Sequence, residues 1–590
     1  MLKDIQTAWD LTLFYTNTKD PQIEKDMQSL ERACATFEKK YRGTQFIKSE
    51  KTLLEALQTF EKLHVLVSGA KPLVYFYYQQ ALNSSDAYVS AQIAQLGERM
   101  TKAGNKLLFF DIQLSKTPLP LQKKYLASKK LAFYRQMLKN TFDSGKYTLS
   151  EPEERILSLK GQTDGMWVDG VDRALNKRVV SFKGEQIPIN EAIPKMPTLA
   201  SKDDRDALWK GISAELDTLK DFTESELNAF YTTKKISDEL RGYKNPYDAT
   251  LKSHEMDAKT VFALVDAVNA HMHVAQKFFA LKKKLLGINE MRISDLNAPF
   301  NDKQKAMPFE EGYRTVREAL KNFDSDFLRI FDRAFAEGHV DVYARKGKSG
   351  GGFHSKTLGN PGVILLNYVP DFRSAFTLAH EMGHLVHSSL SEENQKPLYQ
   401  DYSTAAAEVA SRFTERVYYA HILPTLTHDE QVALRMKVLF EDMNNIFHAV
   451  ADFNAEHRFY QSVYAKGFVP FSEMCDIFVD ENKKFGGDAL TLYPEDGNRI
   501  IYISHFRLRY YLYSYAFGSI VARALYARVE KDPAYIEKVK KFLSAGSSAR
   551  PADIFKAIGI DVSKQDFFTE GIRAVERDVA EFEALVTKQS

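Results

Sequence analysis

Cysteine, long apolar runs and an excess of charge of one sign are all scarce in this sequence of 590 residues. Only Cys34 and Cys475 are present, which excludes a disulfide framework, leaves room for one bridge at most and favours a reducing compartment. The N-terminus, MLKDIQTAWD, has charged and polar residues where a signal peptide places apolar ones. No run approaches the ~20 apolar residues that cross a bilayer. We therefore expect a cytoplasmic protein that does not associate with membranes.

The charges of the chain nearly cancel. Eighty Lys and Arg residues stand against 78 Asp and Glu residues, so the formal net charge is +2. This balance gives no general attraction to nucleic acid, and we expect no nucleic-acid partner. With 44% apolar and 27% charged residues the composition is that of an ordinary globular protein, and a chain of this length usually forms more than one domain. Composition leaves the oligomeric state open.

The first quarter of the chain, residues 1 to about 145, is rich in Leu, Lys, Glu and Gln at helical spacing, which predicts long antiparallel helices. A short β hairpin is predicted next, with Lys183-Gly184 as its turn. The segment PKMPTLASKDDRD then combines two prolines with a cluster of charges. We place a domain boundary there, between an N-terminal helical domain (1–195) and a catalytic domain (196–590). The apolar positions of the hairpin are Val179, Val180, Phe182, Ile187 and Ile189.

His380, Glu381 and His384 form a His-Glu-x-x-His motif within a segment of helical period. Asp371 suits the N-cap of this helix, and the polar run SEENQ closes it. Positions four apart share one face of a helix, so the two imidazoles can bind one metal ion. Glu381 can then activate a metal-bound water without being a ligand. The pattern is a strong signal but not proof, because it occurs by accident in roughly one chain of this size in a hundred, and taken alone it is a hypothesis.

A catalytic zinc ion needs a third protein ligand and one open position. Leu390 stands where the metzincin class requires its third histidine, so a carboxylate must serve. Glu408 is the favoured ligand because it interrupts an alanine-rich apolar run, where an unpaired carboxylate is costly to bury. Asp401 is the main alternative. The other acidic residues considered downstream are Glu392, Glu393 and Glu415.

Three further positions near the motif are candidates for substrate contact. His387 shares the stripe of the motif histidines, but three donors along one helix do not easily reach one ion, so we expect it to support the site or to contact substrate. Gly351 lies in a mobile glycine loop, Gly350 to Gly352, upstream of the motif. His354 follows this loop, and a solvated loop histidine explains it at least as well.

The run HFRLRYYLYSYAFG brings a histidine and several tyrosines close together in sequence. His505, Tyr510 and Tyr513 supply hydrogen-bond donors that an enzyme could direct at a negatively charged reaction intermediate. Composition alone favours a different interpretation, an aromatic core helix with hydroxyl groups at its edge.

Two stretches carry a resemblance to a known family. They are HEMGHLVHSSL, which contains the zinc motif, and AAAEVASRFTE, in which Glu408 and Glu415 stand seven residues apart. Further similar segments are the start WDLTLFY, the block VILLNYVPDFRSAFTLAHEMGH, the aromatic run and the ending FLSAGSSARPADIFKAIGIDV. Together they span nearly the whole chain. The sequence thus resembles the oligoendopeptidase F branch of the thimet-oligopeptidase family of zinc metallopeptidases.

The resemblance implies a fold and a cofactor. The expected fold is mainly α, a helical zincin with a small β sheet beside the active-site helices and an enclosed substrate channel. One zinc ion per chain is expected, and His380, His384 and Glu408 match its ligands. A strand over Val363 to Tyr368, which includes Leu366, is expected to pair with the extended substrate backbone.

The resemblance also implies an activity. The expected reaction is hydrolysis of internal peptide bonds in short oligopeptides by a zinc-activated water, with Glu381 as the general base. His505 together with Tyr510 or Tyr513 is expected to stabilise the oxyanion. The spacing between the histidine and the paired tyrosines is shorter here than in the thimet branch, so the tyrosine that reaches the substrate stays open.

Two other function classes stay open at this point. A dipeptidyl carboxypeptidase would need a cationic group that binds the C-terminus of the substrate, and the sequence identifies none. A helical binding protein with an inactive site would lack a residue that the chemistry needs, whereas every such position is filled here.

Overall fold

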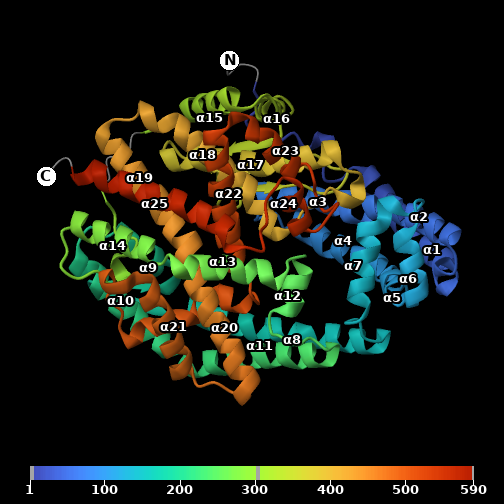
Figure 1. Cartoon of the computed structure of the whole chain (residues 1–590), viewed down its shortest axis with the longest axis horizontal. Helices are drawn as coiled ribbons and strands as arrows, with labels where there is room; N and C mark the ends of the chain where they lie inside the picture. The colour runs from blue at the N-terminus through green and yellow to red at the C-terminus, as the bar shows by residue number, and fades with distance from the viewer. Residues whose placement is uncertain (1–4, 301–305, 588–590) are drawn as a thin grey trace.

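The computed structural model describes residues 5–300 and 306–587, and within them the chain is mainly helical with two small β sheets (Figure 1). The first helices are α1 (Pro21–Tyr41), α2 (Glu50–Gly69), α3 (Lys71–Leu82), α4 (Ala87–Asn105), α5 (Leu108–Ser115), α6 (Leu119–Ala127), α7 (Arg135–Gly145) and α8 (Glu151–Asn176). The next are α9 (Ile189–Lys195), α10 (Lys202–Asp217), α11 (Lys220–Arg241), α12 (Asp248–Ser253), α13 (Ala258–Ala270), α14 (His273–Leu285), α15 (Phe309–Phe323) and α16 (Ser325–Ala336). The last are α17 (Phe372–Asn394), α18 (Thr404–Ile422), α19 (His428–Asp442), α20 (Ala449–Lys466), α21 (Phe471–Gly486), α22 (Tyr513–Lys531), α23 (Ile536–Leu543), α24 (Pro551–Ala557) and α25 (Gln565–Thr587).

Apolar side chains gather into two cores. The smaller core is formed by residues between Trp9 and Phe142, with Val363 and Leu365 added from far along the chain. The larger core runs from Leu175 to Phe582. Figure 1 shows α1–α7, in blue and cyan, on one side of the molecule, and α8 beside α11 below them. We call the part around the smaller core the N-terminal lobe.

The predicted hairpin is confirmed. Strands β1 (Val179–Phe182) and β2 (Glu185–Pro188) pair in antiparallel register around the Lys183-Gly184 turn. Ile189, which was expected to extend the hairpin, instead begins α9. The hairpin contributes to the larger core, and Gly211 of α10 lets the side chain of Val180 approach closely. The domain boundary near residue 195 stays a prediction.

A three-stranded sheet contributes side chains to both cores. Strands β3 (Val340–Tyr343), β4 (Phe353–Ser355) and β5 (Val363–Tyr368) are ordered β3-β5-β4, so β5 is central, parallel to β3 and antiparallel to β4. The two faces of β5 serve different cores, because Val363 and Leu365 pack in the N-terminal lobe while Ile364 and Leu366 pack in the larger core.

Strand β5 has the predicted bounds, and it is the central strand of its sheet, not an edge strand. The sequence suggested that β5 pairs with substrate, whereas hydrogen bonds from β3 and β4 occupy its two edges. The backbone oxygen of Leu366, beyond the reach of β4, accepts a hydrogen bond from the amine of Lys348. β3 and β4 are therefore the two edge strands of the described sheet.

Close helix packing builds the centre of the larger core. Asp371 caps α17 as predicted, since its carboxylate accepts a hydrogen bond from the backbone N–H of Ser374. Helices α17 and α18 approach so closely at Gly383 that a Cβ atom there would lie 2.5 Å from the Cα atom of Ser411. Helix α22 approaches α18 equally closely, because a Cβ atom at Gly518 would lie 2.6 Å from the Cβ atom of Glu408.

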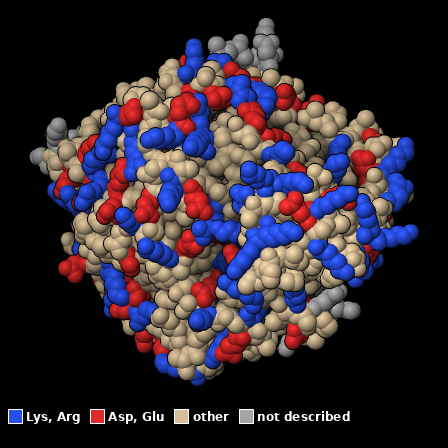
Figure 2. Space-filling view, turned by 45° about the vertical axis from the view of Figure 1, so that its right-hand side comes forward, with Lys and Arg blue, Asp and Glu red and all other residues tan. Residues whose placement is uncertain are grey.

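Acidic and basic side chains are both present across the face of the molecule shown in Figure 2. Among the described residues, no helix combines the length and the apolar character that crossing a membrane requires. Cys34 and Cys475 are free thiols, buried in different cores.

We predict that Gly383→Ala destabilises the protein, because the added methyl group meets backbone atoms of α18 that cannot rotate away. Overpacking of this kind costs about 1–3 kcal/mol of unfolding free energy. Gly97→Ala is the matched control, since a Cβ atom in that helix meets nothing within 4 Å and alanine favours a helix. Chemical denaturation would compare the two, and equal midpoints for Gly383→Ala and the parent would contradict the packing argument.

Candidate metal centre

Helices α17 and α18 bring three metal-binding side chains to one point. His380 and His384 lie one turn apart on α17, and their Nε2 atoms are 3.2 Å apart. The carboxylate of Glu408 on α18 lies 3.7 Å from the Nε2 atom of His380 and 3.8 Å from that of His384. The three ligand atoms all lie within 4.8 Å of one another. The ligand set proposed from the sequence is thus brought together by the fold.

The donor set fits zinc. Two imidazole nitrogens and one carboxylate oxygen are the ligands of many catalytic zinc sites, which keep a fourth position open. All three side chains also line a cavity of about 600 Å³. Asp401, the alternative ligand, lines the same cavity but is exposed and lies outside the cluster.

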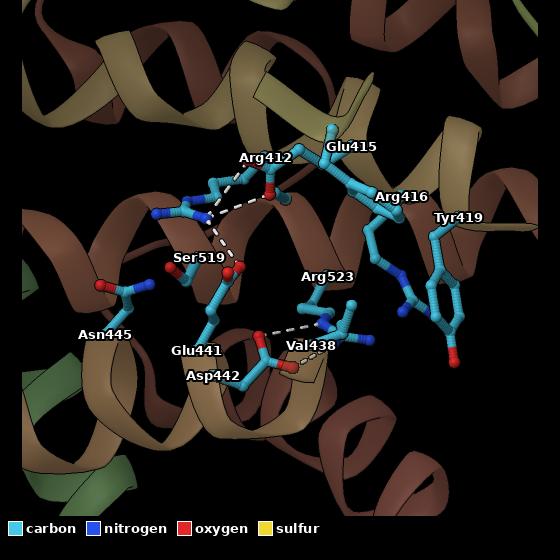
Figure 3. A pocket seen from close by; sticks show the side chains of 12 residues that line it. Arg412, Glu415, Arg416, Tyr419, Val438, Glu441, Asp442, Asn445, Ser519 and Arg523 are labelled. Carbon is cyan, nitrogen blue, oxygen red and sulfur yellow. Dashed lines mark hydrogen bonds and ion pairs between the residues drawn. The ribbon is translucent and has the colours of Figure 1, made fainter. Parts of the chain in front are cut away.

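A second carboxylate orients the first imidazole. An oxygen of Glu415 lies 2.7 Å from the Nδ1 atom of His380, which leaves the Nε2 atom of that ring free for a metal. Arg412 in turn donates a hydrogen bond of 3.0 Å to Glu415 (Figure 3). Burial alone would raise the pKa of Glu415, but Arg412 and His380 lower it to about 2. Glu415 therefore stays ionised and holds the imidazole in one orientation.

The charged network extends beyond Arg412, away from the cavity. Glu441 of α19 lies 3.8 Å from Arg412, and Figure 3 shows its side chain directed at that guanidinium. The neighbouring Asp442 is paired with Arg523 of α22, which also pairs with Asp578 of α25. Through these contacts α17, α19, α22 and α25 are all connected to α18, the helix that carries Glu408.

Glu381 lies beside the cluster without belonging to it. Its side chain lines the cavity, although the residue is only 5% exposed. Burial raises the pKa of this carboxyl group to about 7, against the opposing effect of His380. The carboxylate also accepts a hydrogen bond from the backbone N–H of His354 on β4. A base of this pKa can take up and release a proton near neutral pH.

Of the four residues predicted to contact substrate, His354 lines the cavity, and Gly351, Leu366 and His387 do not. His354 lines the cavity, and its Nε2 atom lies 3.1 Å from the hydroxyl of Ser388. Gly351 adopts a left-handed backbone (φ +77°), and its carbonyl accepts a hydrogen bond from Asn367, while its neighbour Gly352 lines the cavity. The two remaining residues, Leu366 and His387, are each 1% exposed and do not line it.

The predicted residues of the aromatic run have different hydrogen-bond partners. Tyr510 and Tyr513 are fully buried, and their hydroxyls lie 3.0 Å and 2.9 Å from the Nδ1 atoms of His457 and His254. The Nε2 atom of His505 instead lies 3.2 Å from the hydroxyl oxygen of Tyr515. The negative charge of Glu408 contributes to a raised pKa of Tyr515, after the effect of burial.

None of the residues in this run lines the metal cavity in the described structure. Tyr515 is the tyrosine of the run whose pKa is affected by Glu408 on α18. One signal could have selected it, since Tyr515 stands three residues before Gly518, the small residue that faces Glu408, and so shares its helix face.

Sequence reasoning missed several residues of the cavity wall. Ser388 stands four residues after His384, and this helical spacing predicts a shared face. Gln400 and Tyr402 come from the segment between α17 and α18, where no periodic pattern marks a side chain that faces inward. Lys356 lines the wall as well and is paired with Glu392 at 2.7 Å.

The model of peptidase family M3 matches residues 199–574, which contain the whole metal cluster. The chain belongs to peptidase family M3. A second model, described as oligopeptidase F, matches residues 118–166 of this M3 peptidase.

Relatives and solved structures agree with this membership. An oligoendopeptidase F homolog of Lactococcus lactis subsp. lactis (strain IL1403) is 24% identical over 98% of this chain and 97% of its own. Oligopeptidase PepF of Bacillus subtilis (strain 168) is 26% identical over 79% of this chain and 71% of its own. The fold is similar to that of oligoendopeptidase-F from Enterococcus faecium, with a TM-score of 0.71 and 19% identity over 96% of this chain and 99% of that one.

Family membership establishes the broad class. The chain is an M3 metallopeptidase of the oligopeptidase F branch, as its sequence resemblance predicted. The family implies zinc as the metal and peptides as the substrates.

We predict that Glu408→Ala loses zinc, because one of three protein ligands is removed, whereas Asp401→Ala keeps it. Metal analysis after dialysis would measure both variants, with Glu392→Ala as a control outside the cluster. Retention of zinc by Glu408→Ala together with its loss from Asp401→Ala would move the third ligand to Asp401.

Proposed function

We propose that this M3 peptidase is a zinc oligoendopeptidase that hydrolyses internal bonds of short peptides, with Glu381 as the general base. One observation carries the proposal. A buried carboxyl group whose pKa is raised to about 7 lines the same cavity as the cluster of two imidazoles and a carboxylate.

His380, His384 and Glu408 would hold the zinc ion, and Glu415 would keep His380 in the orientation that binding requires. When bound, zinc polarises the scissile carbonyl and makes water a stronger acid. Glu381 accepts a proton as the water oxygen bonds to the carbonyl carbon. It then passes that proton to the leaving amine as the carbon–nitrogen bond breaks.

The outer edge of β4, which pairs with no other strand of the described sheet, is the place proposed for the peptide backbone. The backbone N–H of His354 is directed at Glu381, away from β5, so this edge faces the cavity. An extended peptide that pairs with this edge would lie across the metal cluster. This arrangement replaces the role that sequence reasoning gave to β5. A contribution of His505 with Tyr510 or Tyr513 to oxyanion stabilisation stays a prediction, and the proposal does not depend on it.

The proposed location is the cytoplasm. Both cysteines are free and lie in separate cores, so no bridge between them is available to the folded chain. Reduced thiols of this kind suit a reducing compartment.

We predict that Glu381→Gln keeps one zinc ion per chain while turnover of a peptide falls by about 10² to 10⁴ fold. The amide has the size of the carboxylate but cannot accept the proton. Zinc analysis and steady-state kinetics on the same preparation would test this, with the exposed Glu337→Gln as a control. Loss of metal from Glu381→Gln would instead identify Glu381 as a ligand.

We also predict selectivity for short substrates, because the cavity is walled by α17, α18 and the loop that leads to β4. Peptides of roughly 5 to 20 residues should be cut at internal bonds, and unfolded casein should be cut slowly. Mass spectrometry of digests with and without a chelator would identify the products. Rapid cleavage of casein at many sites would contradict an enclosed channel, and release of C-terminal dipeptides alone would indicate a dipeptidyl carboxypeptidase.

A further inference from the structure

Tyr402 is a residue of the metal cavity for which the chemistry above has no use. It lies in the segment between α17 and α18, six residues before Glu408, and its half-buried side chain lines the cavity. Glu408, the third metal ligand, lines the same cavity. Burial, followed by the negative charges of Asp401 and Glu408, raises the pKa of the phenol, so the hydroxyl keeps its proton and can act as a donor.

The ring of Tyr402 is held by an unusually close contact. It stacks on the imidazole of His387 with 3.6 Å between ring centroids and 7° between ring planes. His387 lies on α17, three residues after His384, and is 1% exposed. Burial lowers the pKa of His387 to about 3, so its ring is neutral. The helix that carries two metal ligands thus also fixes the orientation of the phenol.

The hydroxyl of Tyr402 is free, which sets it apart from the other donors of the cavity wall. No hydrogen bond joins it to any of the described residues 5–300 and 306–587. The other donors are engaged: His354 with Ser388, Ser355 with Tyr78, Lys356 with Glu392 and Asn360, and Gln400 with the backbone of Gln395. A peptide that enters the cavity therefore meets, in Tyr402, a side-chain donor that needs no prior release.

We propose that Tyr402 is a further catalytic residue, whose hydroxyl donates a hydrogen bond to the oxygen of the scissile carbonyl as that oxygen becomes negatively charged. The proposal rests on the peptide hydrolysis proposed above. Glu381 and Tyr402 reach the cavity from different elements, α17 and the segment before α18, so one can take the proton of the water while the other stabilises the oxygen. His387 is a positioning residue, because it acts through the ring of Tyr402.

The decisive variant is Tyr402→Phe, which removes the hydroxyl and keeps the stacked ring. Loss of one donor to a developing oxyanion lowers kcat by about a hundredfold or more, and KM should change little because the bond forms in the transition state. Zinc content should equal that of the parent. The affinity for a phosphinic peptide, a tetrahedral mimic measured by calorimetry on the zinc-loaded protein, should fall by a similar factor.

Two further variants separate the hydroxyl from the stack. His387→Phe keeps a flat ring beneath Tyr402 and should retain kcat within a few fold, whereas His387→Leu should lose much of what Tyr402→Phe loses. Tyr399→Phe is the matched control, since the hydroxyl of Tyr399 is bonded to the backbone of Phe133, away from the cavity. It should keep the kcat of the parent.

The outcomes distinguish this proposal from the proposed function. If the zinc-loaded parent cleaves no peptide, the function fails before Tyr402 is tested. If the parent is active, a Tyr402→Phe variant with unchanged kcat and unchanged phosphinic peptide affinity overturns the catalytic role. Loss of zinc from Tyr402→Phe, or a rise in KM alone, overturns it as well.

Discussion

The close approach of α17 and α18 is the constraint on which the rest of the molecule depends. Two histidines on one helix can offer two ligands, and the third must come from a neighbour near enough for a short carboxylate side chain to reach. Gly383 permits this, because its missing side chain leaves room for the backbone of Ser411. Gly518 likewise leaves room for the Cβ atom of Glu408, so that α22 can pack closely against α18. A metal site thus becomes possible where two glycines let three helices approach closely.

Charged side chains then make this packing specific. Glu415, Arg412 and Glu441 form a continuous chain of polar contacts that begins at the Nδ1 atom of His380. Buried ion pairs add little net stability, but they favour one arrangement of the helices over its neighbours. Burial raises the pKa of Glu381, and within the described part of the chain no Lys or Arg side chain forms an ion pair with it, so it is available as a base.

The sequence was sufficient for the parts of the site that depend on local periodicity. The helix from Asp371, the pairing of His380 with His384 and the strand over Val363 to Tyr368 were all predicted, because helical and strand periods are visible in one segment. Glu408 was found by a different argument, since a carboxylate within an apolar run needs a partner. Strand order was beyond reach, because β4 pairs with β5 through hydrogen bonds that leave no pattern in the sequence.

The tyrosines were difficult for the same reason. The hydroxyls of Tyr510 and Tyr513 are bonded to His457 and His254, which lie 53 and 259 residues away in the chain. Nothing local distinguishes a tyrosine with such a partner from one that faces substrate. Tyr402 shows the converse, since its importance rests on a stack with His387 and on the absence of a bond to described residues, neither of which is visible in sequence.

The alternation of side chains along β5 has a consequence for how this fold could be divided. Val363 and Leu365 complete a core whose other members end at Phe142, so the N-terminal lobe is not a self-contained unit of sequence. Trp9 makes the same connection from the other end, because its indole N–H donates to the backbone oxygen of Ile364. A catalytic fragment that began after the lobe would expose one face of the strand that leads into the zinc helix. Replacement of the N-terminal lobe would therefore also have to rebuild the packing of Val363 and Leu365 on β5.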